Sequence, residues 1–336
     1  MKLSQRITLL ITIAALLLAG FGVFSIFNHP ATGVAAQFSG SILYTHDNAI
    51  WQWRNGNNRR ISISGSVKPG TVTELETQPA WSPDGSKFAY VRYGDSYSDV
   101  VVANADGSNV IRLTNDFNDA TPGTVTYTAG SNWAFGPSWR PDGARIAFLH
   151  DKGSDPLAVW SMSSVPDDTS YKRLSPARIS NVGFERPAWS PANDSIIATC
   201  YESGKAEIWQ YIFDSDNWIT LIKSDEADYD PAWSPDGKYI AYAAKVAGKT
   251  SIWVARADGS GASQLIGNGD IDKGLRTPAW SPDGNAIAYL RMGNDGFDLY
   301  AVSLDTSGGN IKAGGSPQQL TNDHHVSGTG GLSWGK

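Results

Sequence analysis

Short apolar stretches alternate with polar turns along most of the chain, and one phrase recurs within this alternation. Five copies read Pro-x-Trp followed by Ser or Arg and a second Pro, with their tryptophans at Trp81, Trp139, Trp189, Trp233 and Trp280. An incomplete copy around Trp334 ends the chain. The intervals between the six tryptophans are 58, 50, 44, 47 and 54 residues, and a repeat of this length is typical of a propeller or a solenoid.

Each copy predicts a strand that carries the tryptophan, then a tight turn and a second strand. In the Pro-Asp-Gly turns, Pro presets φ and Gly can adopt positive φ. The third copy has Pro191-Ala192-Asn193-Asp194 at this place and lacks glycine, so we expect Asn193 to adopt the left-handed conformation. Two more apolar segments follow, at 100–102 and 112–114 in the first unit. Four strands per unit indicate a propeller blade.

The N-terminal part of the predicted propeller supplies the strands that the last copy lacks. Residues 42–44, 50–53 and 60–62 have the pattern of second, third and fourth strands, and Trp334 marks the first strand of the same blade. Both chain ends then complete one blade, which closes the ring and leaves no long open sheet edge. We therefore predict an all-β, six-bladed propeller of four-stranded blades over residues 37–336.

An uncharged run of 21 residues, 7–27, precedes the predicted propeller and follows Lys2 and Arg6. As a helix it is long enough to cross a bilayer core of about 30 Å, and its positive flank favours a cytoplasmic N-terminus. Small residues at 34–36 also offer a signal-peptidase site. We expect residues 1–36 to be a signal peptide or signal anchor. The protein would then be exported, either anchored to the membrane facing outside the cytoplasm, or periplasmic or secreted after cleavage behind Ala36.

The phrase Pro-Ala-Trp-Ser-Pro-Asp-Gly followed by Ile-Ala-Tyr resembles the WD40-like (PD40) repeat of the TolB family, and the resemblance extends over residues 38–336. It implies a propeller fold and a binding role. TolB proteins also carry an α/β domain before the propeller, and we expect no counterpart here, because only about ten residues separate the apolar run from the first predicted strand. The resemblance therefore does not imply for this chain the roles that are specific to TolB itself.

Composition and charge narrow the class of partner. The net charge is −6 overall and −8 from residue 37 onward, which argues against a nucleic-acid partner. The single cysteine, Cys200, excludes an internal disulfide and is expected to be buried. We expect no cofactor, a monomeric propeller, and contact with a membrane through the N-terminal segment only.

Aromatic residues outside the repeat positions suggest a binding surface. Ten of the 13 tryptophans fall at repeat positions and are expected to pack between blades. Trp133 instead lies with Phe135 in the longest interblade segment, 115–136, which contains no Lys or Arg. Loops of this length without structure of their own are commonly functional or disordered.

The ends of the predicted second strands share one face of a propeller with this segment. The residues at these ends are His46, Arg92, His150, Tyr201, Ala244 and Arg291. Five of the six are large and polar or aromatic, which suits a rim that faces a ligand. The candidate partner-binding residues are therefore His46, Arg92, Trp133, Phe135, His150, Tyr201, Asp230 and Arg291.

Acidic residues and a histidine on the same face are possible metal ligands. Asp228, Asp230, Asp270, Asp272 and His324 offer oxygen and imidazole donors. Asp270 and Asp272 lack the third acidic residue and the glycine of a calcium loop, and the neighbours His324 and His325 are expected to point in opposite directions on an extended chain. We expect no metal site, and neither a nucleophile elbow nor a Cys/His pair, so no catalytic residue is assigned.

Two hypotheses follow for the function. In the first, a non-catalytic propeller presents its loop face and axial mouth to an envelope protein, a peptide or a glycan. In the second, the rim forms the site of a polysaccharide lyase or glycoside hydrolase, with His46 or His150 beside a rim Arg and Asp. An enzyme needs titratable groups that converge in one pocket within hydrogen-bond reach, whereas a binding protein can spread its contacts over the rim.

Overall fold

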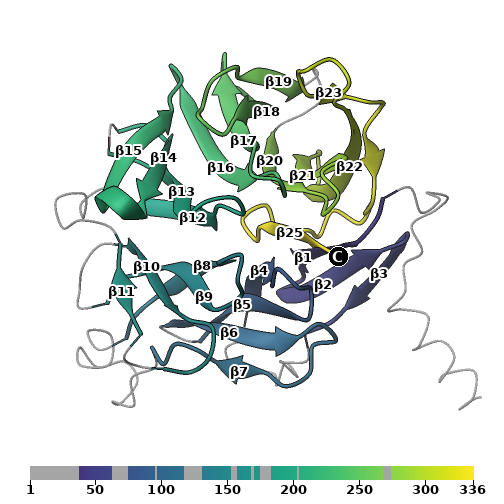
Figure 1. The fold of residues 1–336 in the computed structure, drawn as a ribbon. Coiled ribbons are helices and arrows are strands. Elements are labelled where there is room, and N and C mark those ends of the chain that lie inside the picture. Colours follow the sequence, from purple (N-terminus) through teal and green to yellow (C-terminus); the bar gives the residue numbers. More distant parts are fainter. Residues whose placement is uncertain are drawn as a thin grey trace, which may run out of the picture.

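The computed structural model describes residues 38–62, 75–94, 97–116, 131–152, 157–167, 170–174, 183–202, 204–267 and 274–336. These residues form six antiparallel sheets arranged around one axis (Figure 1). In every sheet the strand order runs outward from an innermost strand that carries a repeat tryptophan. The predicted six-bladed propeller of four-stranded blades is confirmed.

The first three blades follow the predicted order, with strands given from the axis outward. Blade 1 contains β25 (Leu332–Gly335), β1 (Ser41–His46), β2 (Ala49–Arg54) and β3 (Asn57–Arg60). Blade 2 contains β4 (Glu76–Trp81), β5 (Lys87–Tyr93), β6 (Ser98–Asn104) and β7 (Ile111–Arg112). Blade 3 contains β8 (Ala134–Trp139), β9 (Arg145–His150), β10 (Ala158–Ser163) and β11 (Lys172–Arg173).

The other three blades repeat this arrangement, and the last one divides its outer strand. Blade 4 contains β12 (Phe184–Trp189), β13 (Ser195–Cys200), β14 (Glu207–Ile212) and β15 (Asn217–Ile222), with the 3-10 turn η2 (Phe213–Ser215). Blade 5 contains β16 (Ala227–Trp233), β17 (Tyr239–Val246), β18 (Lys249–Arg256) and β19 (Ser263–Ile266). Blade 6 contains β20 (Leu275–Trp280), β21 (Ala286–Met292), β22 (Phe297–Asp305), β23 (Lys312–Ala313) and β24 (Gln318–Gln319).

The ring is closed inside blade 1 by both ends of the propeller. Strand β25 pairs antiparallel with β1, with Trp334 opposite Ile42, and Figure 1 shows the two strands side by side near the axis. The Trp334 indole N–H donates to the backbone oxygen of Ser39 at 2.8 Å. The Phe38 ring packs edge-on against Trp334 at 5.9 Å between centroids. The predicted closure by the N- and C-terminal segments is confirmed.

The repeat tryptophans pack where neighbouring blades meet, as predicted. All six are at most 9% exposed. The indole N–H of Trp139 donates to the Ala80 oxygen of the preceding blade at 3.0 Å, and that of Trp280 to the Ala232 oxygen at 3.1 Å. At these two junctions the indole buries a large apolar area and still satisfies its one donor.

The turn after the innermost strand is held by its own side chains. In the first copy, Ser82 Oγ donates to Asp84 Oδ1 at 2.6 Å, and hydrogen bonds from Ser82 and Ser86 lower the pKa of Asp84 to about 2. Gly85 has the expected positive φ of 70°. In the third copy, the predicted left-handed conformation at Asn193 is wrong. The turn has the same length as in the first copy, with Trp189 opposite Ile196 as Trp81 is opposite Phe88, and it closes on the Asn193 side chain, whose Oδ1 accepts from Ser195 Oγ at 2.6 Å.

The expected apolar helix over residues 7–27, and the cleavage site after Ala36, lie outside the described residues. Within the described residues there is no α-helix, and none of the helical segments there is long and apolar enough to span a bilayer. Cys200, predicted to be buried, is fully buried in β13, and burial raises the pKa of its thiol to about 11.

Candidate functional site

Five of the innermost strands are bulged around the residue before the repeat proline, and in blade 1 Gly331 directly precedes β25. These six residues have positive φ values between 48° and 71°. They are Gln78, Gly136, Arg186, Asp230, Thr277 and Gly331, and we call them the inner ring. Proline cannot donate to a ladder hydrogen bond, and a bulge redirects the strand at the point where pairing is interrupted. The repeated Pro-x-Trp sequence, whose tryptophan packs in the core, therefore also places one variable residue of each blade at the axis.

The inner ring surrounds an axial cavity of about 1160 Å³. The innermost strands run from the face that bears the interblade loops toward the face that bears the Pro-Asp-Gly turns. The residues one position earlier than the inner ring therefore lie nearer the loop face. Four of these also line the cavity, namely Phe135, Glu185, Tyr229 and Arg276, and we call them the mouth residues.

Hydrogen bonds and ion pairs connect the inner ring across blades. Arg186 Nε lies 2.6 Å from Asp230 Oδ1, and the Thr277 backbone N–H donates to Asp230 Oδ2 at 3.1 Å. Arg186 Nη2 also donates to the backbone oxygen of Thr329 at 2.8 Å. Thr329 precedes β25 in blade 1, which lies across the ring from blade 4, so the Arg186 side chain spans the axis and braces three blades.

The mouth combines tyrosines with charged groups. The Tyr201 hydroxyl donates to Glu185 Oε2 at 2.9 Å. Burial raises the pKa of Tyr201, the nearby carboxylates of Glu185 and Asp230 raise it further, and the guanidinium of Arg276 opposes them. The Tyr201 hydroxyl therefore stays protonated at neutral pH and is a hydrogen-bond donor. These groups can orient a ligand with polar and charged atoms.

An aromatic wall adjoins the mouth between blades 2 and 3. It consists of Tyr93, Trp133 and Phe135, and the Trp133 and Phe135 rings are stacked at 6.1 Å between centroids with an interplanar angle of 8°. Tyr93 lies 6.0 Å from Trp133 and 5.8 Å from Phe135. Tyr93 and Phe135 line the cavity. Residues 117–130 of the interblade segment that precedes this wall lie outside the described residues.

The structure brings only part of the predicted rim to the cavity. Tyr201, Phe135 and Asp230 line it, and Trp133 contacts it through Phe135. Arg92 and Arg291 are held elsewhere in their blades. Arg92 Nη2 donates to the fully buried Glu76 at 3.1 Å and to the Tyr90 hydroxyl at 2.9 Å, and the Arg291 guanidinium lies over the Tyr300 ring at 5.1 Å.

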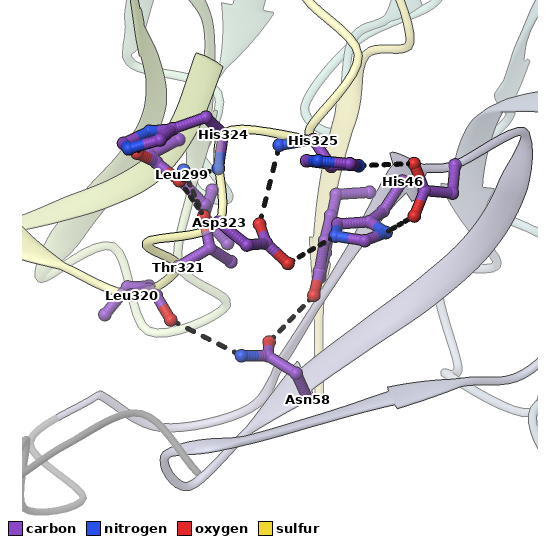
Figure 2. Close-up of polar contacts among 11 residues, drawn as sticks. His46, Asn58, Leu299, Leu320, Thr321, Asp323, His324 and His325 are labelled. Atoms are coloured by element: carbon purple, nitrogen blue, oxygen red, sulfur yellow. Dashed lines mark hydrogen bonds and ion pairs between the residues drawn. The ribbon is translucent and has the colours of Figure 1, made fainter. Parts of the chain in front are cut away.

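The two predicted rim histidines lie buried between blades. His46 Nε2 lies 2.7 Å from Asp323 Oδ2 at the junction of blades 6 and 1, as Figure 2 shows. His150 Nε2 lies 2.9 Å from Asp116 Oδ1 at the junction of blades 2 and 3. His46 is 5% and His150 is 2% exposed. We call these two arrangements the histidine junctions.

Each histidine junction is built by the same four residues, Leu-Thr-Asn-Asp, at 113–116 and 320–323. The threonine hydroxyl donates to an aspartate of the third strand, Thr114 to Asp99 at 2.9 Å and Thr321 to Asp298 at 3.0 Å. The phrase occurs twice in the chain, each time in the blade before a second strand that ends in histidine. This internal repetition is the sequence signal from which the two junctions can be identified as a structural pair.

The candidate metal ligands have other surroundings. Asp228 is 1% exposed, Asp230 is engaged by Arg186, and His324 Nδ1 lies 2.6 Å from Asp298 Oδ2. Asp270 and Asp272 lie outside the described residues. Among the residues that the structure does describe, no three His, Cys, Asp or Glu side chains are grouped so that they could hold a metal ion.

A Gly-x-Ser-x-Gly spacing, which the sequence analysis did not expect, occurs at residues 331–335. A nucleophile elbow needs a sharp turn between a strand and a helix. Here Ser333 lies within β25, and its Oγ accepts the backbone N–H of Trp81 at 2.9 Å. The residue types match the motif, but the backbone does not provide the turn that exposes a nucleophile.

The cavity-forming residues that the sequence analysis missed are Arg186, Glu185, Tyr229 and Arg276. All lie one or two positions before the repeat proline. Within an otherwise repeated phrase, these positions vary in charge and size from blade to blade. This variation from blade to blade is the feature of the sequence from which the four cavity residues could be identified.

Comparison with known proteins agrees with this architecture. Residues 124–319 match the family described as TolB beta propeller domain, PD40. The chain is 30% identical over 128 residues to the "Uncharacterized peptidase YuxL" of Bacillus subtilis (strain 168), an overlap of 37% of this chain and 17% of that protein. The match therefore spans less than a fifth of the length of this curated relative.

Solved structures share the fold at low sequence identity. The TolB structure from Acinetobacter baumannii superposes with a TM-score of 0.64 at 18% identity, covering 90% of this chain and 68% of that one. A chain of the Nidogen/Laminin complex gives 0.59 at 11% identity, with 88% and 98% covered. Puromycin hydrolase gives 0.53 at 15% identity, with 88% and 46% covered. Since the family match covers more than half of its residues, this chain belongs to the TolB beta propeller domain family.

Proposed function

We propose that this protein is a non-catalytic recognition module that binds a polypeptide partner at the loop-face mouth of its axial cavity. The observation that carries the proposal is the convergence of the aromatic wall, Tyr201 and the charged mouth residues on one cavity. A concave site lined by aromatic side chains and a few placed polar groups is the usual form of a binding site.

The opposite face offers much less to a partner. Its turns repeat Pro-Asp-Gly in four of the blades. The carboxylates of Asp84, Asp236 and Asp283 each accept a hydrogen bond from the serine two residues earlier in the same turn. Groups that are already paired within near-identical turns provide little chemical variety for specific recognition.

A polypeptide is favoured as the partner class by the proteins that share this fold. One of the similar propellers was solved in a Nidogen/Laminin complex, which is an assembly of two proteins. Other similar propellers belong to peptidases, which act on polypeptides, as in the tricorn protease.

The geometry supports binding over a polysaccharide lyase or glycoside hydrolase at the rim. That alternative places His46 or His150 beside a rim Arg and Asp in one pocket. Both histidines are buried in separate junctions and neither lines the axial cavity. General acid–base catalysis needs the titratable group within hydrogen-bond reach of the substrate.

We also propose that the protein acts outside the cytoplasm. The support is the sequence of the first 36 residues, in which Lys2 and Arg6 precede an uncharged run. Fractionation of cells that produce the full chain, with protease added to intact spheroplasts, tests this. Protection of the propeller in intact spheroplasts, or its recovery in the cytosol, contradicts the proposal.

Site-specific photocrosslinking in the producing cells tests the binding surface. A benzophenone amino acid at Tyr201 should crosslink to a polypeptide, and the same group at Asp236 on the opposite face should not. In a titration with the identified partner, Trp133→Ala should weaken binding by about 2 kcal/mol, the loss typical of an aromatic anchor, and the matched surface variant Asp236→Ala should leave it unchanged. Crosslinks from Asp236 alone, or crosslinks to glycan instead of polypeptide, would contradict this proposal.

A further inference from the structure

Arg276 differs from the other charged side chains around the cavity. Arg186 is paired with Asp230 at 2.6 Å, and Lys205 Nζ donates to the backbone oxygens of Ser224 and Asp225. Arg276 is the second residue of β20 and lines the cavity, partly buried. Across the described residues, its guanidinium has neither a hydrogen bond nor an ion pair with protein; it lies over the Tyr229 ring, 5.7 Å from Cζ, and interacts electrostatically with the Tyr201 hydroxyl.

The Tyr229 ring gives this guanidinium a defined place. Tyr229 lies in β16 of the neighbouring blade, and its hydroxyl is hydrogen-bonded to Thr250 Oγ1 at 2.9 Å. An arginine held over an aromatic face keeps its N–H donors available around the plane of the guanidinium. Such a fork matches both oxygens of a carboxylate and forms strong, charge-assisted hydrogen bonds. The geometry of this guanidinium therefore suits the binding of a carboxylate.

The aromatic wall lies on the opposite side of the ring. Phe135 belongs to blade 3 and Arg276 to blade 6, which are three blades apart in a ring of six. A segment bound across the mouth can thus place an apolar side chain against the wall and a carboxylate at Arg276. The two subsites call for different chemistry, and together they fix the orientation of an extended peptide.

We propose that Arg276 is a specificity-determining residue that selects polypeptide segments carrying a carboxylate a few residues from an aromatic or large apolar side chain. This inference rests on the proposed function and names the ligand chemistry of the same site. The exposed carboxylate of Glu185 lies at the same level of the mouth and accepts a hydrogen bond from the neutral Tyr201 hydroxyl. Its negative charge repels a peptide carboxylate and therefore lowers the affinity that Arg276 provides.

The test uses the full chain in mild detergent and an array of heptapeptides that each contain one Trp. Every peptide is present in versions with Asp, Asn or Lys at a chosen position, all acetylated and amidated at their ends. A fourth version carries Asn with a free C-terminal carboxylate, which separates the two sources of a carboxylate. Wild type should prefer Asp over Asn by about tenfold or more, the range expected for a hydrogen-bonded charge.

Matched variants locate the preference. Arg276→Gln should abolish the discrimination between Asp and Asn while the Asn peptides still bind. Arg276→Lys should retain part of it, since an ammonium keeps the charge without the fork. Glu185→Gln should increase affinity for the Asp peptides. Lys249→Gln, at an exposed lysine of β18 that does not line the cavity, should change nothing.

The outcomes separate the two proposals. Equal binding of Asp and Asn peptides by wild type, or a preference that survives Arg276→Gln, overturns the role of Arg276 and leaves the binding function standing. Binding that is indifferent to Phe135→Ala, or no binding to any array peptide, overturns the proposed function and this inference with it. Circular dichroism of each variant establishes that it is folded.

Discussion

Asp228 shows how one buried carboxyl group depends on its position between blades. It is 1% exposed in β16, and burial raises its pKa, with the Glu207 carboxylate adding to the effect. A raised pKa means that folding disfavours the charged form of the group. Its contribution to stability is therefore fully present below the unfolded pKa of about 3.9 and is lost as the pH rises through the folded pKa.

Asp228→Asn should accordingly stabilise the protein at neutral pH. Between the two pKa values the wild type loses about 1.4 kcal/mol of unfolding free energy for each pH unit, and the amide does not titrate. Thermal melts at pH 7 should give a higher Tm for Asp228→Asn, and the difference should vanish near pH 3.5. If Asp228→Asn instead has a lower Tm than wild type at pH 7, the Asp228 carboxylate is compensated by its surroundings in the folded protein.

At the scale of elements, the histidine junctions tie one blade to the next. In the junction of blades 2 and 3, the Lys152 backbone N–H donates to His150 Nδ1 at 2.9 Å. This leaves Nε2 as the protonated nitrogen, which donates to Asp116. Because both side chains are buried, removal of either one leaves its partner without compensation.

A double-mutant cycle on His150 and Asp116 measures this dependence. Each single alanine variant should lose about 3–5 kcal/mol, and the double variant should lose clearly less than the sum, since neither orphaned group remains. Chemical denaturation gives the three free energies. His325→Ala is the control, because His325 pairs with Asp47 on the surface, with both side chains about 60% exposed, and such pairs contribute roughly 0–1 kcal/mol. Additive losses at His150 and Asp116 would mean that the two side chains act independently.

At the scale of the whole molecule, the ring depends on one short strand from the far end of the chain. Strand β25 pairs with β1 and places Trp334, 8% exposed, against Phe38. Ser333 Oγ in addition accepts the Trp81 backbone N–H of blade 2 at 2.9 Å. The loss of this strand exposes the inner edge of β1 and opens the propeller between blades 6 and 2.

Deletion of residues 331–336 should therefore lower the free energy of unfolding by at least about 3–5 kcal/mol, the usual loss for a buried Trp replaced by Ala. Deletion of Lys336 alone, which is exposed and lies beyond β25, is the matched control and should have little effect. Differential scanning calorimetry compares the two. Equal melting temperatures for the long and the short deletion would contradict closure by β25.

The sequence by itself determined the blades, their number and their closure. The repeated phrase joins a buried tryptophan to a turn that only a few residue types can form, so local chemistry and spacing specify each blade without knowledge of the others. The predictions failed where a turn without glycine adopts another conformation, as at Asn193, and where an outer strand divides, as in blade 6. Outer strands bury little, and their bounds follow from packing more than from pattern.

Only the tertiary structure decided which polar residues reach the axis. His46 and His150 end their strands with the same pattern as Tyr201, yet an aspartate from the preceding blade holds each histidine in a junction. Arg276 and Arg186 lie in strands that the sequence assigns to the core, and the bulge before the proline turns them toward the cavity. The direction of a side chain at a bulge, and the partner that it meets from another blade, depend on how six separate segments are arranged in space, which no local pattern encodes.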